Sequence, residues 1–394
     1  MASVRVLETS DDLARAFEVF RTALIGIPPY PGEITGISEP GRVLGGVVDD
    51  EIVGTAAAYS STIVVPGGAR LPHLAVTRVG VLPTHTRRGV ARSLMNYQLA
   101  DARQRGVPIA TLRAAEGGIY ERYGYGIAAW IQSVEVAARK AVFRPGVPVG
   151  GPVRLAAAPW ADARRVYERV DPSWVGAMSR TDEWWTVRQV RSDDDKEQAV
   201  VVLHGPPGAE DGYVRYHPGE WRDEGCTLLV DDFVAGSLEA RLGLLRYLFS
   251  VDLVGPVRFD ALPMDDPIRE FLVDVRPVKT VGVEDEIWLR LVDVPSALAA
   301  RTYRGPGEVV VGVVDEVLPE NAGAYWIGAS GAKPTTAAPQ LTVDVAALGA
   351  AYLGGVRWRD LVAAGRVTVA DASAVAVADE LFAVDAAPYC GTFF

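Results

Sequence analysis

The sequence predicts an α+β protein in which a mixed α/β unit occurs twice and a third, smaller unit follows. A strand, a turn and a helix follow one another from Val76 to about Arg105, and the same order returns from Cys226 onward, in pattern but not in identity. The Pro/Gly-rich segment Gly146–Pro152 separates the two copies, as a linker would. We therefore expect three domains, with the bounds 1–146, 147–291 and 292–394.

Length, charge and composition exclude several classes of protein. A chain of 394 residues is long for one ordinary domain, and 49% hydrophobic residues suffice for sizeable cores. A net charge of −11 argues against a nucleic-acid partner, which would need a basic face. No apolar run is long enough to cross a membrane, and the N-terminal segment is charged where a signal peptide is apolar. We expect a cytoplasmic protein without a membrane partner.

The cysteines and histidines do not suggest a metal site. The sequence holds two cysteines and four histidines, and they are scattered along the chain. Metal sites and disulfide frameworks need such residues at short, regular spacings. We therefore expect no metal and no disulfide framework, and we interpret the histidines as ordinary surface or core residues.

Hydrophobic periodicity predicts the elements of the first unit. A helix from Asp11 to Leu24 would be capped by Ser10, since its apolar residues recur on one face. Asp49 and Asp50 mark the turn of a hairpin. The other expected elements are strands at Val4–Leu7, Arg42–Val48, Ile52–Ser60, Leu74–Val81 and Val107–Ala114, and helices at Arg88–Arg105 and Gly117–Tyr123.

The second unit repeats this order, and the third follows from the same signals. Asp231 and Asp232 stand at the position that corresponds to the basic turn before the first unit's second helix. In the second unit we expect a helix at Ala161–Val170, strands at Val200–His204, Gly212–Tyr216, Cys226–Val230 and Pro256–Leu262, and a short helix at Asp265–Phe271. In the third we expect strands at Glu308–Val317, Leu341–Val345 and Val367–Ala370, and helices at Ala346–Leu353, Trp358–Ala364 and Asp371–Phe382.

A basic turn at the start of the first unit's second helix predicts an anion site. Arg87, Arg88 and Gly89 lie there, where the backbone N–H groups of a helix are unpaired and its dipole is positive. Neither a P-loop nor a dinucleotide glycine pattern is present. One glycine, two arginines and a helix end suit the pyrophosphate of coenzyme A. The alternative is a plain helix start with two solvated arginines.

The strand before this turn would hold the rest of such a ligand. The edge N–H and C=O groups of Val79–Val81 can bind the amide-bearing pantetheine arm, as a peptide adds to a sheet edge. Gly80 would permit a bulge or a close approach there. Carboxylates at Asp231 and Asp232 would repel a pyrophosphate. We therefore expect the second copy to have lost cofactor binding.

A second motif, Ala114–Gly126, follows the next strand and is specific to one superfamily. Together with Arg88-Gly89-Val90-Ala91, its Ile-Tyr-x-x-x-Gly-Tyr box resembles the GNAT acyltransferases. The resemblance places Tyr120 near the thioester sulfur and Tyr125 in the core. A tyrosine is protonated at neutral pH, with a usual pKa of about 10, so Tyr120 can donate a proton to the leaving thiolate.

The layout of the whole chain resembles the Eis (enhanced intracellular survival) acetyltransferases, which join a GNAT domain, a degenerate GNAT domain and a sterol-carrier-protein-like domain. The resemblance implies an acetyl-CoA-dependent N-acetyltransferase acting on aminoglycoside-like polyamines or lysine side chains, and a homohexamer. Thr86 and Ala115 depart from the family pattern, which weakens the expected CoA contacts. The residues implied to bind acetyl-CoA are Val79, Gly80, Val81, Arg87, Arg88, Gly89, Val90, Ala91, Arg92, Ala115 and Glu116.

The apolar chain end, Gly391–Phe394, is expected to dock, because free aromatic side chains would expose apolar area. In the family the terminal carboxylate lies in the active site, so the resemblance implies that the Phe394 carboxylate is the general base. It would act directly or through a water, or would only bind the ammonium. The alternative is a terminal segment packed in the core of the third domain.

Other functions stay open at the level of the sequence. Another acyl donor or acceptor amine is compatible with the same motifs. A lipid- or sterol-binding protein with a vestigial acyltransferase domain is an alternative of another class, against which the intact Arg87-Arg88-Gly89 and Tyr120 argue. The segment Leu24–Gly32 would be the lip of the amine pocket or a plain surface loop. Direct transfer is expected, with neither cysteine as a nucleophile.

Overall fold

The computed structural model describes residues 2–30, 32–194 and 199–394. These residues fold into two compact units. The first unit consists of Met1–Ala129, Trp174–Val187 and Asp285–Phe394, and the second of Trp130–Ser173 and Arg188–Glu284. The chain changes unit after residues 129, 173, 187 and 284, and the three domain bounds expected from the sequence remain predictions.

The N-terminal sheet of the first unit consists of β1 to β5 and the end of β12. Its strands follow the order β1-β2-β3-β4-β5-β12. Every pair is antiparallel except β4 with β5, which is parallel and therefore needs a crossover, here helix α2. The bounds are β1 Ser3–Val6, β2 Val43–Val48, β3 Glu51–Val64, β4 Arg70–Val81, β5 Ile109–Leu112 and β12 Val278–Leu291.

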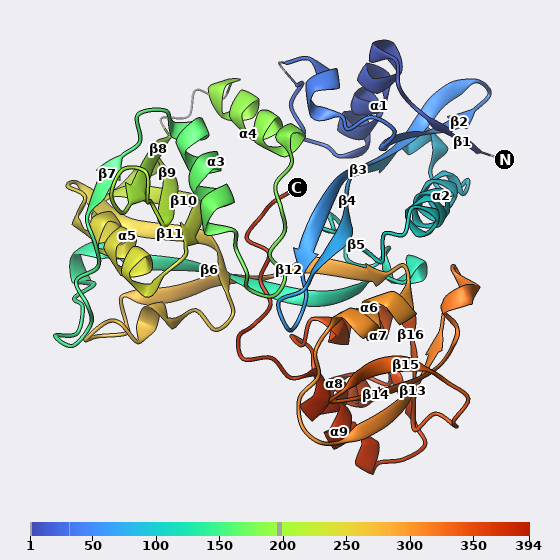
Figure 1. Ribbon diagram of the computed structural model, residues 1–394. Coiled ribbons are helices and arrows are strands. Elements are labelled where there is room, and N and C mark those ends of the chain that lie inside the picture. The colour runs from blue at the N-terminus through green and yellow to red at the C-terminus, as the bar shows by residue number, and fades with distance from the viewer. Residues whose placement is uncertain (1, 31, 195–198) are drawn as a thin grey trace. The chain divides into compact units, whose positions relative to one another are not determined.

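Two helices cover opposite faces of this sheet (Figure 1). Helix α1, Ser10–Ala23, packs against Ala57, and helix α2, Val90–Gln104, packs against Ala56. Ala56 and Ala57 are consecutive residues of β3, so their side chains point to opposite faces. Because both faces of β3 are buried, its sequence is mostly apolar and does not alternate with polar residues.

Of three local predictions for this part of the chain, one is confirmed and two are corrected. Thr9, not Ser10, caps α1, because the Thr9 side chain accepts the Asp12 N–H and Ser10 is already helical. Asp49 and Asp50 form the expected hairpin turn, with φ angles of 51° and 64°. The helix expected at 117–123 is reduced to a 3₁₀ turn at Glu121–Tyr123, because Gly117 and Gly118 before it do not favour a helix.

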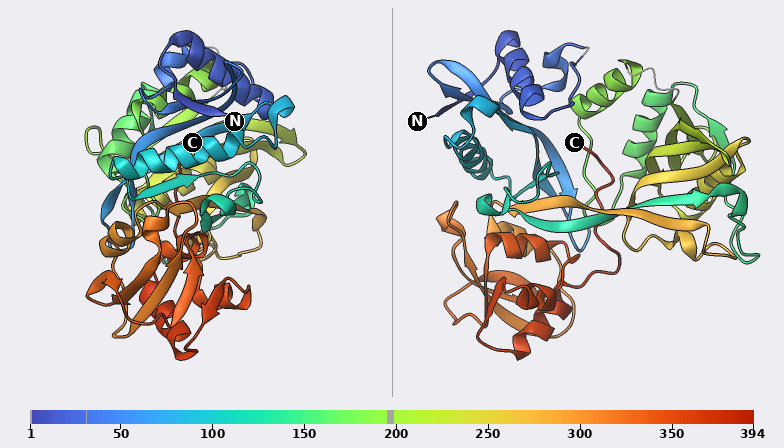
Figure 2. Two further views of the ribbon diagram at one scale, coloured as in Figure 1. Left: turned by 90° about the vertical axis from the view of Figure 1, so that its right-hand side faces the viewer. Right: turned by 180° about the vertical axis from the view of Figure 1, so that it is seen from behind.

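The C-terminal part of the first unit, coloured orange to red in Figure 2, forms a second sheet. Its five strands follow the order β15-β14-β13-β16-β17. Strands β14 and β15 were not expected, because their glycines and Lys333-Pro334 carry little strand signal. The strand bounds are β13 Glu308–Val314, β14 Gly323–Gly328, β15 Gly331–Thr335, β16 Leu341–Asp344 and β17 Val367–Val369. The helices are α6 Val294–Ala300, α7 Val345–Tyr352, α8 Trp358–Ala363 and α9 Ser373–Phe382.

Several contacts join the C-terminal part of the unit to its N-terminal sheet, and two of them are close and buried. A Cβ on Gly126 would lie 1.9 Å from the carbonyl oxygen of Ala346 in α7, so only glycine permits the approach. Arg290 of β12 donates two hydrogen bonds, of 2.7 and 2.8 Å, to the carboxylate of Asp315. Both side chains are fully buried. Removing either charge would leave the other buried and uncompensated.

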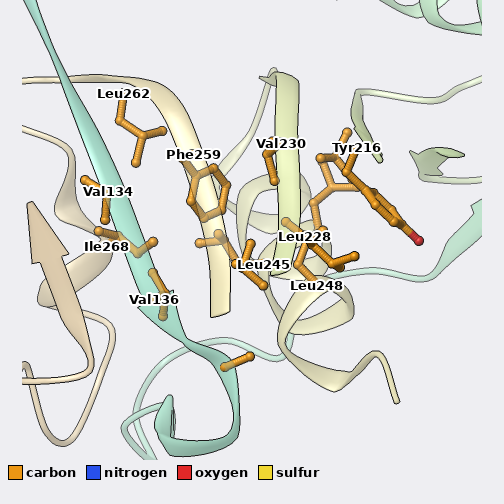
Figure 3. Close-up of a cluster of buried hydrophobic side chains, with 14 of the residues drawn as sticks. Val134, Val136, Tyr216, Leu228, Val230, Leu245, Leu248, Phe259, Leu262 and Ile268 are labelled. Atoms are coloured by element: carbon orange, nitrogen blue, oxygen red, sulfur yellow. The ribbon is translucent and has the colours of Figure 1, made fainter. Parts of the chain in front are cut away.

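The second unit has its own sheet and its own hydrophobic core. The core holds the side chains labelled in Figure 3, with Phe259 edge-on to Phe233 at 5.8 Å. Its strands follow the order β6-β11-β10-β9-β8-β7. The bounds are β6 Gly126–Ala137, β7 Val153–Leu155, β8 Val200–His204, β9 Gly212–Arg222, β10 Gly225–Ala235 and β11 Val254–Pro263. The helices are α3 Pro159–Val170, α4 Asp182–Asp194, which begins in the first unit, and α5 Leu238–Ser250.

The expectation that Asp231 and Asp232 occupy the turn before α5 is wrong. Both lie within β10, where Asp231 accepts hydrogen bonds from Arg215 and Asp232 accepts one from Tyr213. These partners on β9 satisfy the carboxylates, so β10 continues beyond the apolar run that was visible in the sequence.

Gly236 and Ser237 form the turn before α5, and a side chain binds an N–H group at this helix end. The Ser237 hydroxyl accepts the Ala240 N–H and donates to Asp211 at 2.6 Å. Side chains of this unit therefore occupy the N-terminus of α5, where an anion would bind. The groups at this helix end are a capping serine and its carboxylate partner, and not Asp231 and Asp232; the loss of cofactor binding by the second copy stays a prediction.

Candidate functional site

Strands β4 and β5 pair over a short stretch and then separate. Their parallel register runs from His73↔Ile109 to Val76↔Leu112. Beyond it, Gly80 and Val81 pair with β3 on one side, and no described strand pairs with them on the other. The sheet is therefore open beside Val79–Val81, and the edge groups of that stretch are available to a ligand.

A bulge in β4 marks the start of this opening. Thr77 pairs with Ala57 and Gly80 with Thr55, so β4 holds an additional residue in between. Arg78 lies there with a φ of 50°, an unusual value for a residue other than glycine. Its guanidinium donates to Ile37 O and to Tyr59 Oη, both at 2.9 Å. The sequence reasoning placed a bulge at Gly80 and missed Arg78, whose strained backbone has no sequence signal.

Next to the opening, the N-terminus of α2 faces a cavity. Gly89 is the N-cap residue, in the left-handed conformation with a φ of 80°, and no side chain among the described residues caps this end. The cavity has a volume of about 480 Å³. It is lined by Val81, His85, Thr86, Arg87, Gly89, Val90, Ala91, Arg92, Arg122 and Tyr123.

Six of the eleven residues implied to bind acetyl-CoA line this cavity, and five do not. Val81, Arg87 and Gly89–Arg92 are among the lining residues. Arg88, Val79, Gly80, Ala115 and Glu116 are not. The Thr86 hydroxyl donates to Pro83 O at 3.2 Å, within its own turn.

Positive charge converges on the cavity from two segments. Arg87 and Arg92 come from the turn and from α2, and Arg122 comes from the 3₁₀ turn after β5. None of the three forms an ion pair with another described residue. Sequence reasoning missed Arg122, although it is two residues after Tyr120. The unpaired N–H groups and three guanidinium groups together suit a polyanion such as a pyrophosphate.

Tyr120 lies on the same face of the sheet, in the core shared by α2 and β5. Its side chain is 6% exposed, and its ring lies 6.2 Å from Tyr125 and 6.3 Å from Trp288. Burial, with smaller contributions from Tyr123 and Glu116, raises the pKa of Tyr120 to about 12. The phenol therefore stays protonated at neutral pH and can act as a proton donor. Tyr125 is fully buried, and burial raises its pKa as well.

The opposite face of β4 and β5 carries His73 and Thr111, whose side chains share that face because their strands are parallel and in register. His73 Nε2 and Thr111 Oγ1 lie 2.6 Å apart. Burial lowers the pKa of His73 to about 3, so the imidazole is neutral at physiological pH. His73 is the core histidine that the sequence led us to expect, but its contact with the chain end was not anticipated.

The C-terminal segment reaches this face of the sheet. The Phe394 ring lies edge-on to His73 with ring centres 6.4 Å apart. The Arg113 guanidinium lies 4.7 Å from the centre of the Phe393 ring, and Trp184 Nε1 donates to Phe393 O at 2.7 Å. The last residues therefore lie against β4, β5 and the start of α4, and not inside the five-stranded sheet (Figure 2).

The segment expected to form the lip of the amine pocket is only partly described. Pro31 lies outside the described residues. Before it, the Tyr30 ring lies edge-on to Phe17 of α1 at 6.0 Å, while Ile25 is fully exposed. The role of Leu24–Gly32 as a lip stays a prediction.

The described residues meet neither the requirements of a metal site nor those of a membrane-spanning helix. Within the described ranges, no group of three or more histidine, cysteine, aspartate or glutamate side chains is arranged to hold a metal ion. None of the described helices combines the length and the apolar character that crossing a membrane requires.

Comparison with protein families finds three matches along the chain. Residues 4–128 and 176–291 each match a family described as an acetyltransferase (GNAT) domain. Residues 294–391 match the sterol carrier protein domain.

Individual proteins match over most of the chain. An uncharacterized N-acetyltransferase of Streptomyces coelicolor is 37% identical, with 86% of this chain and 84% of that protein covered. N-acetyltransferase Eis of Mycobacterium tuberculosis is 32% identical, with 85% and 84% covered. The crystal structure of Eis1 from Mycobacterium abscessus is 41% identical and covers both chains fully, with a TM-score of 0.93. A GCN5-related N-acetyltransferase from Anabaena variabilis, 19% identical with a TM-score of 0.87, shares the fold.

The buried neutral His73 predicts a pH-dependent stability. Its folded-state pKa, about 3, is below the unfolded value of about 6.5, so the unfolded state binds the proton first as the pH falls. Stability should therefore decline below pH 6.5, by roughly 2 kcal/mol between pH 7 and pH 5 from this group alone. Urea unfolding at both pH values, for the wild type and His73→Gln, measures it. The same pH dependence in both proteins would show that His73 does not carry it.

Proposed function

This chain belongs to the Eis family of N-acetyltransferases, and we propose that it transfers an acetyl group from acetyl-CoA to the nitrogen of an amine. GNAT acetyltransferases use acetyl-CoA as the acyl donor. The acceptor class that we propose is an aminoglycoside-like polyamine or a lysine side chain. The transfer is direct, without a covalent enzyme intermediate.

The observation that carries this proposal is the open sheet edge beside an open helix end. Val79–Val81 are unpaired on the side of β5, and the uncapped N-terminus of α2 lies directly beyond that stretch, with its cavity and three guanidinium groups. Coenzyme A consists of a pyrophosphate joined to an extended arm with two amide groups. The helix end suits the first part and the strand edge suits the second.

The two faces of the opened sheet suit the two substrates. Tyr120 lies on the face of α2 and the cavity, which we assign to the donor. His73 and Phe394 lie on the other face, which we assign to the acceptor amine. On this assignment the acetyl group is presented through the gap between β4 and β5.

The chemistry that we propose uses three groups of the chain. The amine nitrogen attacks the thioester carbon, and its proton passes to the carboxylate of Phe394. The N–H groups at the edge of Val79–Val81 stabilise the oxyanion as the carbon becomes tetrahedral. The carbon–sulfur bond then breaks, and Tyr120 gives its phenolic proton to the departing thiolate. Solvent carries the amine proton from the carboxylate and restores the phenol.

A lipid- or sterol-carrier function is not favoured by the C-terminal sheet. A hollow of about 410 Å³ lies there beside α8 and α9. Its lining includes Arg357, Arg359, Asp379 and Glu380. Arg359 pairs with Asp379 and Arg357 with Asp360, and a sterol would have to remove these ion pairs from water. We therefore keep acyl transfer as the function of the chain.

A donor and acceptor survey tests the proposal. Acetyl-, propionyl- and longer acyl-CoA are each offered with polyamines, aminoglycosides and lysine peptides, and release of free CoA thiol is followed. We expect release with acetyl-CoA and at least one amine, and thermal protection of the protein by acetyl-CoA. Neither turnover nor protection by any acyl-CoA, together with protection by hydrophobic ligands, would refute an acyltransferase.

Tyr120→Phe removes the proposed proton donor and keeps the ring. Turnover should fall by roughly 10²- to 10⁴-fold, the usual worth of general acid catalysis, while acetyl-CoA affinity changes little. Steady-state kinetics and calorimetric binding of acetyl-CoA separate the two effects. Tyr123→Phe is the matched control, since Tyr123 lines the cavity but has no proposed proton-transfer role. Unchanged turnover in Tyr120→Phe would remove this residue from the mechanism.

Residues added after Phe394 convert its carboxylate into an amide. An added Gly-Ser dipeptide should therefore abolish most turnover, while the thermal midpoint and acetyl-CoA binding stay close to those of the wild type. Turnover and melting are measured on the same preparations. A fully active extended protein would exclude the terminal carboxylate as the base.

A further inference from the structure

We propose that Glu286 is a positioning residue, which sets where the C-terminal carboxylate lies by binding the main chain three and four residues before the end. This inference rests on the proposed function, in which the Phe394 carboxylate is the general base. Glu286 itself does not touch the reacting atoms. It acts through the segment Tyr389–Phe394.

The Glu286 carboxylate binds two consecutive backbone N–H groups. Its Oε2 accepts the Cys390 N–H at 2.8 Å, and its Oε1 accepts the Gly391 N–H at 2.9 Å. The side chain is fully buried, and Arg113 Nη1 lies 3.3 Å from Oε1. Charge-assisted bonds of this kind are stronger than neutral ones, and both oxygens are used, so the geometry of the turn is fixed in two directions.

The chain turns sharply at this carboxylate. Gly391 has a φ of 68°, and a Cβ there would lie 2.7 Å from the Tyr389 ring. Only glycine accommodates both the left-handed conformation and the close ring. The turn directs Thr392 and the residues after it back toward β4.

A second set of contacts holds the residues after the turn. Arg180 donates from Nε to Thr392 Oγ1 and from Nη2 to Gly391 O, both at 3.1 Å. Its guanidinium also lies over the rings of Trp184 and Trp185, at 4.3 and 5.2 Å from their centres. With the bond from Trp184 to Phe393 O, the segment is bonded at every residue from Cys390 to Phe393.

This density of bonds is unusual for a segment without regular structure. No helix or strand is formed after α9 ends at Phe382. Ends of this kind fray unless they are tied down, because ordering each residue costs conformational entropy. Here the bonds continue to one residue before Phe394. A base must be held within about 1 Å of its working position, since such a displacement can cost on the order of 100-fold in rate.

Burial raises the pKa of Glu286 above its usual value, and its hydrogen-bond partners, Arg113 and the N–H groups of Cys390 and Gly391, limit that rise. The carboxylate form is the one that accepts from both N–H groups. A glutamine in its place keeps the shape but offers one acceptor oxygen and one NH₂ group, which cannot accept the second N–H.

Glu286→Gln tests the inference with two readouts. The first is steady-state kinetics, in which kcat should fall by roughly 10- to 100-fold while KM for acetyl-CoA stays within about twofold. The second is the rate at which a carboxypeptidase releases Phe394 from the folded protein, which should rise. A purely structural role would not produce this split between kcat and KM together with a loosened chain end.

Asp315→Asn is the matched control. Asp315 is likewise a fully buried carboxylate of the first unit, but its partner is Arg290. This variant should lower the thermal midpoint while leaving Phe394 release and kcat near wild-type values. If Glu286→Gln does not fold, Glu286→Asp replaces it, because it keeps the charge but draws the carboxylate back from the N–H groups of Cys390 and Gly391; the same loss of kcat and faster release are then expected.

The outcomes separate this inference from the function on which it rests. Full activity of Glu286→Gln, alongside an inactive extended protein, would overturn the inference and leave the base assignment intact. A loss of kcat without faster release of Phe394 would overturn it as well, because Glu286 would then act elsewhere. A fully active extended protein would remove the base assignment itself.

Discussion

The site depends on one constraint, the early end of the parallel pairing between β4 and β5. Parallel strands normally stay paired because each unpaired buried N–H or C=O group is costly. Here the bulge at Arg78 turns β4 away after four paired residues, and the open edge beyond it needs a partner. A ligand with its own amide groups is such a partner. The helix end of α2, the cavity and Tyr120 are all placed by the way the chain continues on either side of this gap.

The C-terminal sheet acquires a role from the same geometry. It packs onto the first sheet of its unit through Gly126 and through the buried pair Arg290–Asp315. The last residues then return to the face that carries His73, where Glu286 and Arg180 hold them. The C-terminal segment thus lies beside residues of the N-terminal sheet. In the proposed mechanism, the domain that resembles a lipid carrier supplies the end of the chain that enters the site.

Much of the fold could be predicted, because it rests on local patterns. The strand, basic turn and helix at 76–105 were confirmed, as was the hairpin at Asp49-Asp50. Strands without a clean apolar pattern, such as β14 and β15, were not found. The prediction that Asp231 and Asp232 form a turn was wrong for a related reason. Consecutive carboxylates are typical of a turn, but here residues of β9 bind them and keep them within a strand.

The site was predictable where it is continuous in sequence and not elsewhere. The basic turn at Arg87–Gly89 could be identified from its residue pattern, and Tyr120 from a sequence motif. Glu286 and Arg180 stand far from both in the chain, and each is an ordinary charged residue until the fold brings the C-terminal segment to it. Pairings of this kind follow from tertiary packing, which a single sequence does not encode in any local signal. The homohexamer and the cytoplasmic location stay predictions.

Burial shifts the pKa values of two groups on opposite faces of the site in opposite directions. Burial takes the pKa of His73 down to about 3 and that of Tyr120 up to about 12, so neither changes charge across the range in which cells live. An acceptor amine, by contrast, must lose its own proton before it can attack. His73 and Tyr120 therefore do not set the pH optimum, which depends on the acceptor amine and on the general base. One enzyme would show a lower optimum with a weakly basic amine than with a strongly basic one.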